Sequence, residues 1–206
     1  MKLLLDASAA HFQRHADKAF IGGQLLTPLT NYRLRGYPSQ FAIDNGAFSH
    51  FDRRAFESLL ERSKPDRDRC LFVTVPDVVG SARRTLECWE HWHLELPAWP
   101  LAFVAQDGCE DITIPWEHMA AVFIGGTTDF KMSVAAAQII KAAQIIGCHT
   151  HVGRVNTPDR WLHFERLGVD TCDGSGVSRY DWMLDAIDEA ITNGGKYEPL
   201  LTGLTD

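Results

Sequence analysis

Residues 168–180, GVDTCDGSGVSRY, run a short apolar, strand-like stretch directly into a turn rich in glycine. Asp173 ends the apolar stretch, and Gly174 and Gly176 follow it closely. A carboxylate at a strand end, beside backbone that lets a ligand approach, suits a nucleophile or a group that stabilises positive charge. The alternative is that Asp173 caps a helix that begins near Tyr180, because aspartate is a favoured cap residue.

Outward from this segment, short apolar runs alternate with helical stretches, which is the pattern of a parallel sheet with crossover helices. Most of the runs are continuously apolar, which predicts strands that are buried on both faces. The expected strands are residues 2–6, 40–44, 70–75, 100–105, 121–125, 148–153 and 169–173. The expected helices are residues 9–20, 53–63, 81–95, 133–146, 158–167 and 180–192.

This alternation predicts an α/β fold, a compact or incomplete (β/α)8 TIM-like barrel, rather than an open doubly wound sheet. An eighth strand is not obvious, and residues 198–201 in the tail are the candidate for it. The stretch 112–119 is too short for a full crossover helix. Because the chain has 206 residues, is 45% hydrophobic and has no low-complexity tract, we expect one domain over residues 1–206.

Charge and cysteine content narrow the function classes. The formal net charge of -7 argues against broad, nonspecific binding along a phosphate backbone. The five cysteines lack a close metal-ligand spacing, which indicates reduced thiols in a cytoplasmic protein. We expect no membrane segment, and Asp6 interrupts the apolar start before it reaches signal-peptide length. Six arginines could form a local basic rim around a site or could simply lie on solvated helix faces. They are Arg33, Arg35, Arg53, Arg54, Arg83 and Arg84.

Polar or glycine-rich segments follow nearly every apolar run. They are Asp44-Asn45-Gly46, Pro76-Asp77, Gln106-Asp107-Gly108, Gly125-Gly126, Gly153-Arg154-Val155-Asn156 and Asp173-Gly174. In a barrel of this class the carboxyl ends of the strands meet at one rim, where active sites lie. Aspartate, asparagine and glycine are also ordinary turn residues, so a single strand that ends in them is weak evidence for a functional site. Their succession along the chain predicts a shared site at the rim.

The same segments, in the same order, resemble the tRNA-guanine transglycosylase superfamily. They are FAIDNGAFS (41–49), VPDVVG (75–80), FVAQDG (103–108), FIGG (123–126), HVGRVNTPDRW (151–161) and GVDTCDG (168–174). The resemblance covers residues 41–173 and is closest to the small phage and bacterial relatives that insert deazapurines into DNA. It implies a (β/α)8 barrel in which Asp173 is the nucleophile at C1′ of the nucleotide and Asp44 is the second catalytic acid or base.

The resemblance also implies a base-binding set, which consists of Asp77, Gln106 and the backbone of Gly125 and Gly126. The carboxylate and the amide can accept from and donate to the edge of a flipped base. Cleavage of the bond from base to sugar passes through an oxocarbenium-like state. One carboxylate near C1′ and one proton donor near the base are therefore sufficient to catalyse it. Aromatic residues that could stack on the base, or else belong to the core, are Phe48, Phe103, Phe123 and Phe130.

Departures from the family pattern restrict these expectations. No cysteine or histidine follows Asp173, whereas relatives that act on tRNA carry a zinc segment there, so we expect no zinc, no other cofactor and no tRNA-docking subdomain. Asp107 stands where the family has glycine and adds charge near the base site, which predicts a base other than ordinary guanine. His149 and His151 alternate on one strand, and we expect them to have a structural role rather than to bind metal.

Three further residues are candidates for phosphate or sugar contacts: Lys131, Arg154 and Asn156. For Lys131 the alternative is an ordinary surface lysine. The leading prediction is an enzyme that cleaves the N-glycosidic bond of a nucleobase in DNA, with a modified base as target and hydrolysis or base exchange as outcome. Its partners would be a flipped nucleotide in DNA and, for base exchange, a free base. The enzyme would then act in DNA modification or in defence against phage. The alternatives are tRNA base exchange, a small-molecule nucleoside hydrolase and a non-catalytic nucleotide-binding barrel.

Overall fold

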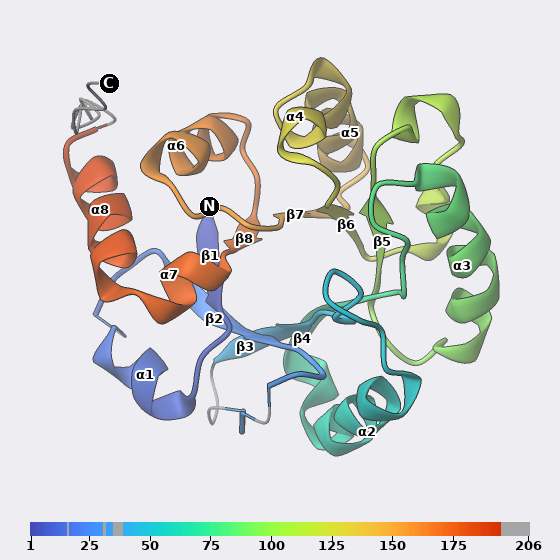
Figure 1. Ribbon diagram of the computed structural model, residues 1–206, viewed down its shortest axis with the longest axis horizontal. Helices are drawn as coiled ribbons and strands as arrows, with labels where there is room; N and C mark the ends of the chain where they lie inside the picture. The colour runs from blue at the N-terminus through green and yellow to red at the C-terminus, as the bar shows by residue number, and fades with distance from the viewer. Residues whose placement is uncertain (16, 31, 35–38, 195–206) are drawn as a thin grey trace, which may run out of the picture.

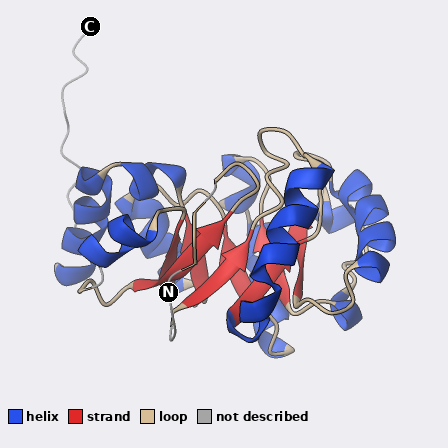
Figure 2. Ribbon diagram, turned by 90° about the horizontal axis from the view of Figure 1, so that it is seen from below, coloured by secondary structure: helices blue, strands red, loops and turns tan. Residues whose placement is uncertain are grey.

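The computed structural model describes residues 1–15, 17–30, 32–34 and 39–194. At its centre, eight parallel strands form a closed barrel in sequence order, and helices surround it (Figures 1 and 2). The strands are β1 (Lys2–Leu5), β2 (Ile21–Leu26), β3 (Gln40–Ile43), β4 (Cys70–Thr74), β5 (Leu101–Ala105), β6 (Ala121–Ile124), β7 (His149–Val152) and β8 (Thr171–Asp173). Pairing of β8 with β1 closes the barrel, with Leu4 opposite Asp173. The predicted α/β barrel is confirmed.

The strand that the sequence did not indicate is β2, which lies between β1 and β3. Its sequence, IGGQLL, contains two glycines that weaken the pattern of a strand. The barrel needs one of them, because a Cβ on Gly23 would lie 2.2 Å from the carbonyl oxygen of Gln40 on β3. The tail segment proposed as the eighth strand, residues 198–201, lies outside the described residues, and the barrel closes without it.

Helices form the outer layer. They are α1 (Ala9–Arg14), α2 (Arg53–Ser63), α3 (Ala82–Glu95), α4 (Thr128–Lys131), α5 (Val134–Ile145), α6 (Pro158–Arg166), α7 (Ser175–Arg179) and α8 (Asp181–Thr192). The chain also forms three short 3-10 turns, η1 (Lys64–Arg69), η2 (Cys109–Asp111) and η3 (Trp116–His118). Only η2 and η3 connect β5 to β6, as the short stretch 112–119 predicted. The helix expected over residues 9–20 was too long, because α1 ends at Arg14.

Side-chain hydroxyls and carboxylates fix several helix starts. Ser8, Asp52, Ser133 and Thr157 each accept a hydrogen bond from a backbone N–H in the first turn of the helix that follows. These bonds satisfy donors that a helix cannot satisfy internally, and each contributes on the order of 1 kcal/mol. The starts predicted at residues 53, 133 and 158 therefore agree with the structure to within a residue.

The core has two parts, which explains why the strands are apolar on both faces. Side chains on one face of the strands fill the barrel interior: Leu4, Leu25, Ala42, Phe72, Ala102, Val104, Ala121 and Phe123. Side chains on the other face pack against the helix layer, where Trp89 and Trp161 are among the largest fully buried residues. The side chains of the first group fill the barrel interior below its mouth.

Two sequence expectations can be compared with the described residues. Within them, no helix is both long enough and apolar enough to cross a bilayer. The cysteines, Cys70, Cys88, Cys109, Cys148 and Cys172, are all free thiols, and the last three are buried.

Candidate functional site

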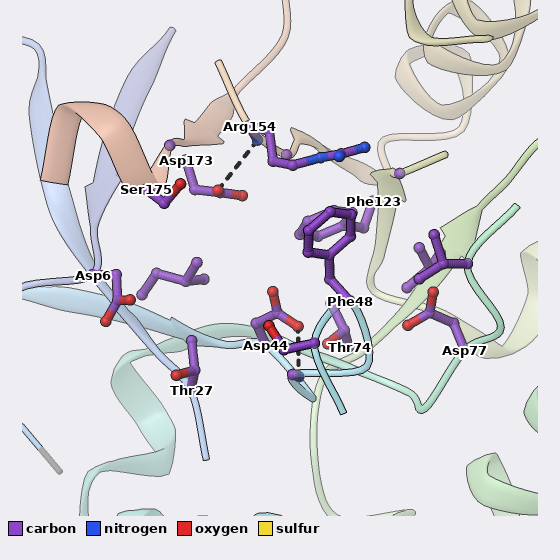
Figure 3. Close-up of a pocket in the computed structure, with 18 of the residues that line it drawn as sticks. Asp6, Thr27, Asp44, Phe48, Thr74, Asp77, Phe123, Arg154, Asp173 and Ser175 are labelled. Atoms are coloured by element: carbon purple, nitrogen blue, oxygen red, sulfur yellow. Dashed lines mark hydrogen bonds between the residues drawn. The ribbon is translucent and has the colours of Figure 1, made fainter. Parts of the chain in front are cut away.

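A pocket of about 350 Å³ opens at the carboxyl-terminal rim of the barrel. Its walls come from the strand ends and from the loops that follow them, including Asp6 after β1, Asp44 after β3 and Asp77 after β4 (Figure 3). The structure brings most of the sequence-predicted site residues to this pocket: Asp44, Asp77, Gln106, Gly125, Gly126, Lys131, Arg154 and Asp173. A volume of this size suits one small ligand, because pockets for small molecules begin at about 300 Å³.

Asp173 ends β8 and is held at both carboxylate oxygens. Oδ1 accepts a hydrogen bond of 3.2 Å from the backbone N–H of Arg154 (Figure 3). Oδ2 lies 3.0 Å from Nε2 of His151. The residue is 9% exposed, so these two groups fix the carboxylate while it still lines the pocket. Two acceptor bonds are the arrangement that an ionised carboxylate makes. Asp173 therefore does not act as the cap of a helix near Tyr180.

His151 is fully buried and belongs to a hydrogen-bonded chain behind Asp173. Its Nδ1 lies 2.8 Å from Oγ1 of Thr171, and the same oxygen lies 2.8 Å from Nε2 of His149. If Nε2 of His151 donates to Asp173, its Nδ1 accepts from the Thr171 hydroxyl, and that oxygen accepts from His149. Burial, together with repulsion from His151, lowers the pKa of His149 to about 4, against the attraction of Asp170, so His149 is neutral near neutral pH.

The histidines were expected to be structural, and the structure adds a contact between His151 and Asp173 that the sequence analysis missed. The register of β7 against β8 places His151 opposite Thr171 and thereby beside the carboxylate of Asp173. Nothing in a single sequence gives this register. The one available signal was the alternation of histidines on a strand that borders the strand of Asp173.

Asp44 follows β3 and has a different environment from Asp173. Its Oδ1 accepts a hydrogen bond of 3.0 Å from the backbone N–H of Gly46. Burial and, to a smaller extent, the negative charges of Asp173, Asp77 and Asp6 raise its pKa to about 7, although the bond from Gly46 opposes this shift. A carboxyl group with this pKa can donate or accept a proton near neutral pH, as a general acid or base must.

Asp6 is a fourth carboxyl group in the pocket, which the sequence analysis did not assign to the site. Its Oδ1 is buried and has no hydrogen-bond partner among the described residues. Burial raises its pKa and the charge of Asp173 adds to this, while a hydrogen bond from Thr30 and the charge of Arg179 oppose it. The signal was present in the sequence, because Asp6 follows the first apolar run just as Asp44 and Asp173 follow theirs.

Asp77 is fixed by two amide side chains. Its Oδ1 accepts a hydrogen bond of 2.9 Å from Nδ2 of Asn45, and its Oδ2 accepts one from Nε2 of Gln106. Oε1 of Gln106 in turn accepts a bond of 3.0 Å from the N–H of Gly80. Burial raises the pKa of Asp77 although both amide bonds lower it. Gln106, expected to contact the base, is therefore engaged with the protein and orients Asp77.

The backbone of Gly125 and Gly126 forms part of the pocket wall, and both positions require glycine. A Cβ on Gly125 would lie 2.8 Å from Cγ1 of Val104. Gly126 has a φ of +69°, and a Cβ there would lie 2.6 Å from a carboxylate oxygen of Asp107. Each glycine thus keeps the wall flat and lets a planar ligand approach the peptide groups.

The interpretation of Asp107 needs correction. It does not line the pocket, because its Oδ2 accepts a hydrogen bond of 2.9 Å from the N–H of Thr127 and its Oδ1 accepts one from the Thr127 hydroxyl. Burial raises its pKa, but these bonds outweigh burial and the net shift is downward. Asp107 therefore fixes the turn before α4, and it gives no ground for expecting a base other than guanine.

Lys131 is buried rather than a surface lysine, with 3% of its surface exposed. Its Nζ donates a hydrogen bond of 2.8 Å to the carbonyl of Gly153, beside the pocket. Burial and, to a smaller extent, the charge of Arg154 lower its pKa to about 8, although the charge of Asp173 opposes this shift. Because the ammonium is bonded to the barrel rim, it neutralises part of the acidic pocket from within.

Arg154 and Asn156 follow β7 and differ in placement. Arg154 lines the pocket with a φ of 61°, donates to the carbonyl of Gly126, and holds its guanidinium 4.5 Å from the centre of the Phe48 ring. Asn156 does not line the pocket. Its Oδ1 accepts hydrogen bonds from the backbone N–H groups of Gly176 at 2.9 Å and Val177 at 3.3 Å. Asn156 therefore fixes the first turn of α7, and the expected contact with phosphate or sugar has no support here.

Of the aromatic residues considered for stacking, Phe48 and Phe123 line the pocket. Phe48 lies on the loop after β3, is 64% exposed and extends over the pocket, whereas Phe123 forms part of its floor (Figure 3). Phe103 and Phe130 are core residues that do not line it. An exposed aromatic side chain at the mouth of a polar pocket is available to cover a planar ligand.

Basic residues around the pocket differ from those proposed for a rim. Arginines 33, 53, 54, 83 and 84 are exposed and do not line the pocket, and Arg35 lies outside the described residues. Arg53, for example, pairs with Glu57 and Glu95 on the helix layer. Arg154 and Arg179 are the arginines that do line the pocket. These two arginines provide a small cationic area rather than a long basic surface that could bind an extended nucleic-acid backbone.

Comparisons with known proteins define the fold. No family model matches the chain, and no curated protein matches it. A solved structure of a flavocytochrome b2 mutant superposes with a TM-score of 0.54 at 12% sequence identity, over 95% of this chain and 65% of that chain. This chain thus spans about two thirds of the length of that protein. At this identity the similarity shows a shared barrel fold alone, and the resemblance to the transglycosylase superfamily stays a prediction.

Proposed function

We propose that this protein cleaves the N-glycosidic bond of a nucleobase in DNA, with a flipped nucleotide in the pocket. The observation that carries the proposal is a pair of carboxyl groups in one pocket with opposite roles. Asp173 accepts hydrogen bonds at both oxygens, and Asp44 has a pKa of about 7. One group is held in place by hydrogen bonds at both oxygens, and the other can carry a proton.

In the proposed reaction, Asp44 donates its proton to the departing base while the bond from C1′ to the base nitrogen breaks. Positive charge then develops on the sugar, and the Asp173 carboxylate stabilises it or bonds to C1′. Water, or a second base in the exchange reaction, replaces Asp173 or adds at C1′. Asp44, now ionised, accepts the proton that the incoming nucleophile releases. The bond between His151 and Asp173 keeps the carboxylate in place through both steps.

The base would lie between Phe48 at the mouth of the pocket and Phe123 at its floor, against the flat wall of Gly125 and Gly126. Stacking on aromatic side chains contributes about 1–3 kcal/mol per base. Asp77 provides the directional contact, because Asn45 and Gln106 hold its carboxyl group in one orientation. A pocket of about 350 Å³ accommodates one nucleotide rather than a paired segment, which requires that the nucleotide leave the duplex.

A second candidate function, a nucleoside hydrolase, is favoured by one observation. The buried Oδ1 of Asp6 has no hydrogen-bond partner among the described residues, and it lines the same pocket. A sugar hydroxyl would satisfy it, whereas a phosphate on the sugar would be repelled. Free nucleosides offer such hydroxyls, but a nucleotide within DNA carries phosphates on both sides. The net charge of -7 agrees with this alternative.

The test is to incubate the protein with unmodified duplex DNA, base-modified duplex DNA, tRNA and free nucleosides, and to identify released bases by mass spectrometry. Alkali then reveals abasic sites in the DNA, and a labelled free base reveals exchange. Base release that Asp173→Asn abolishes, and that Asp68→Asn retains, supports the proposal, because Asp68 is an exposed aspartate on η1 that does not line the pocket. Release at the wild-type rate by Asp173→Asn would overturn the mechanism. Release from nucleosides alone would select the hydrolase.

A further inference from the structure

A second cluster of polar side chains lies outside the barrel, where α1 meets the start of α8 (Figure 1). His11 and His15 are four residues apart on α1 and therefore share one helix face. Asp181 is the first residue of α8 and points at both imidazoles. None of these three residues lines the pocket, so the proposed function does not involve them.

The three side chains converge as metal ligands do. Nε2 of His15 lies 3.1 Å from Oδ1 of Asp181, and Nε2 of His11 lies 4.0 Å from the same oxygen. The three candidate ligand atoms all lie within 4.8 Å of one another. Zinc bonds of about 2.0–2.2 Å in a tetrahedral site separate neighbouring ligand atoms by roughly 3.3–3.6 Å. Small rotations of the side chains would therefore complete three corners of a tetrahedron.

His11 provides the independent sign that a ligand belongs here. Its Nε2 is buried, has no hydrogen-bond partner among the described residues, and faces Asp181. An unpaired polar atom in such a position is costly unless something binds it. Burial lowers the pKa of His11, and the charges of His15 and Arg14 lower it further against the pull of Asp181.

One contact competes with a metal. Nη2 of Arg14 lies 2.7 Å from Nδ1 of His11 and donates to it, which places the imidazole proton on Nε2. A metal at Nε2 requires the other tautomer, so the exposed Arg14 side chain must turn away when the metal binds. Removal of Arg14 should therefore increase metal affinity, an effect that a purely structural role of the histidines would not produce.

Charges along α8 favour a cation at this position. Asp181, Asp185 and Asp188 follow one face of the helix, and Lys18, after α1, pairs with the last two. Asp181 is the member of this row that faces the histidines instead, and it is 56% exposed. Solvent can therefore reach the cluster and supply a fourth ligand.

We propose that His11, His15 and Asp181 form a binding site for a divalent transition metal of the zinc class, with water as the fourth ligand, which connects α1 to α8. Two imidazoles and one carboxylate are a ligand set that zinc accepts. The site joins helices from opposite ends of the described chain, so its expected effect is on the stability of the barrel. It differs from the cysteine-rich zinc segment whose absence the sequence analysis noted.

The test is titration of the purified, chelator-treated protein with zinc, and with cobalt, whose visible absorption reports tetrahedral coordination. Wild-type protein should bind one equivalent, and His11→Ala, His15→Ala and Asp181→Asn should each lose at least about tenfold in affinity. Arg14→Ala should bind more tightly than wild type. His91→Ala is the matched control, because His91 on α3 pairs with Glu95 at 2.7 Å, and among the described residues no third metal-ligating side chain joins them.

Two results would overturn the proposal. One is a zinc affinity of His11→Ala and His15→Ala that equals the affinity of the wild-type protein. The other is a loss of zinc affinity in His91→Ala as large as the loss in the ligand variants. His11→Ala protects the test from folding failure, because it removes only the exposed bond from Arg14 to Nδ1, and Nε2 makes no hydrogen bond among the described residues. In a thermal melt, zinc at about a hundredfold excess over Kd should raise the Tm of wild-type protein by roughly 5–10 °C. The melt and the titration need no enzyme activity, so they stand apart from the proposed function.

Discussion

Substitution of Asp44 by asparagine should stabilise the protein in a pH-dependent manner. Asn keeps the shape of the side chain and an oxygen that can accept the bond from the N–H of Gly46. It removes a carboxyl group whose pKa in the folded protein is about 7, against an ordinary value of 3.8. The unfolded chain loses this proton near its ordinary pKa, whereas the folded protein retains it up to about pH 7. The stability that Asp44 contributes is therefore fully present below about pH 3.8. It falls as the pH rises from there and is lost once the pH has risen through about 7.

The structure sets the size of the effect. The difference between the folded and ordinary pKa values is about three units, at about 1.4 kcal/mol each, so the ceiling is about 4 kcal/mol. Asp44 lines a pocket that is open to water, which screens part of this cost. We therefore expect a stability difference between Asp44→Asn and wild type that grows by about 1–3 kcal/mol from about pH 5 to about pH 8.

The assay is urea denaturation of wild type, Asp44→Asn and Asp68→Asn at these two pH values. Asp68→Asn removes the same charge from an exposed position and should follow wild type at both. A difference between Asp44→Asn and wild type that stays constant with pH would refute the argument, because it would show that the pKa of Asp44 is not raised. The same variant should lose base release if Asp44 donates the proton, so a gain in stability would accompany a loss of activity.

Further predictions concern the residues around Asp173. If Asp173 is the nucleophile, His151→Gln should lower kcat by about 10–100-fold with little change in KM, because a hydrogen bond to a charged group contributes about 1.5–3 kcal/mol and this one holds Asp173 in place. A change in KM alone would contradict this prediction. Phe48→Ala should instead raise KM by roughly 10–100-fold if it stacks on the base, measured by steady-state kinetics. Gly153→Ala should destabilise the fold by about 1–3 kcal/mol in urea, since its Cβ would lie 2.8 Å from two ring atoms of Phe123.

The sequence alone predicted the barrel and most of the pocket, for a reason that lies in parallel-sheet geometry. Apolar runs that are buried on both faces identify strands, and the strands of such a barrel all end at the same rim. The position of a residue along its own strand therefore predicts its neighbours without any knowledge of register. Asp44, Asp77, Gly125 and Asp173 reach the pocket by this rule, and Asp6 obeys it too, although it was not included. The glycines of β2 hid that strand, because their role depends on the approach of β3.

Only the tertiary structure decided which of these side chains are free to act. Hydrogen bonds between residues far apart in sequence engage Gln106 with Asp77, Asp107 with Thr127, and Asn156 with α7. A sequence pattern cannot distinguish a polar side chain that faces a ligand from one that satisfies a backbone N–H.

The electrostatic state of the site also depends on distant neighbours. The pKa of Asp44 follows from burial beside other carboxyl groups, and Lys131 is neither exposed nor fully basic because α4 places it against the carbonyl of Gly153. The same holds for the proposed metal site, where the spacing of His11 and His15 is visible in the sequence but their third ligand is not. Asp181 is 166 residues away from His15 along the chain, and only closure of the barrel by β1 and β8 brings α1 and α8 together.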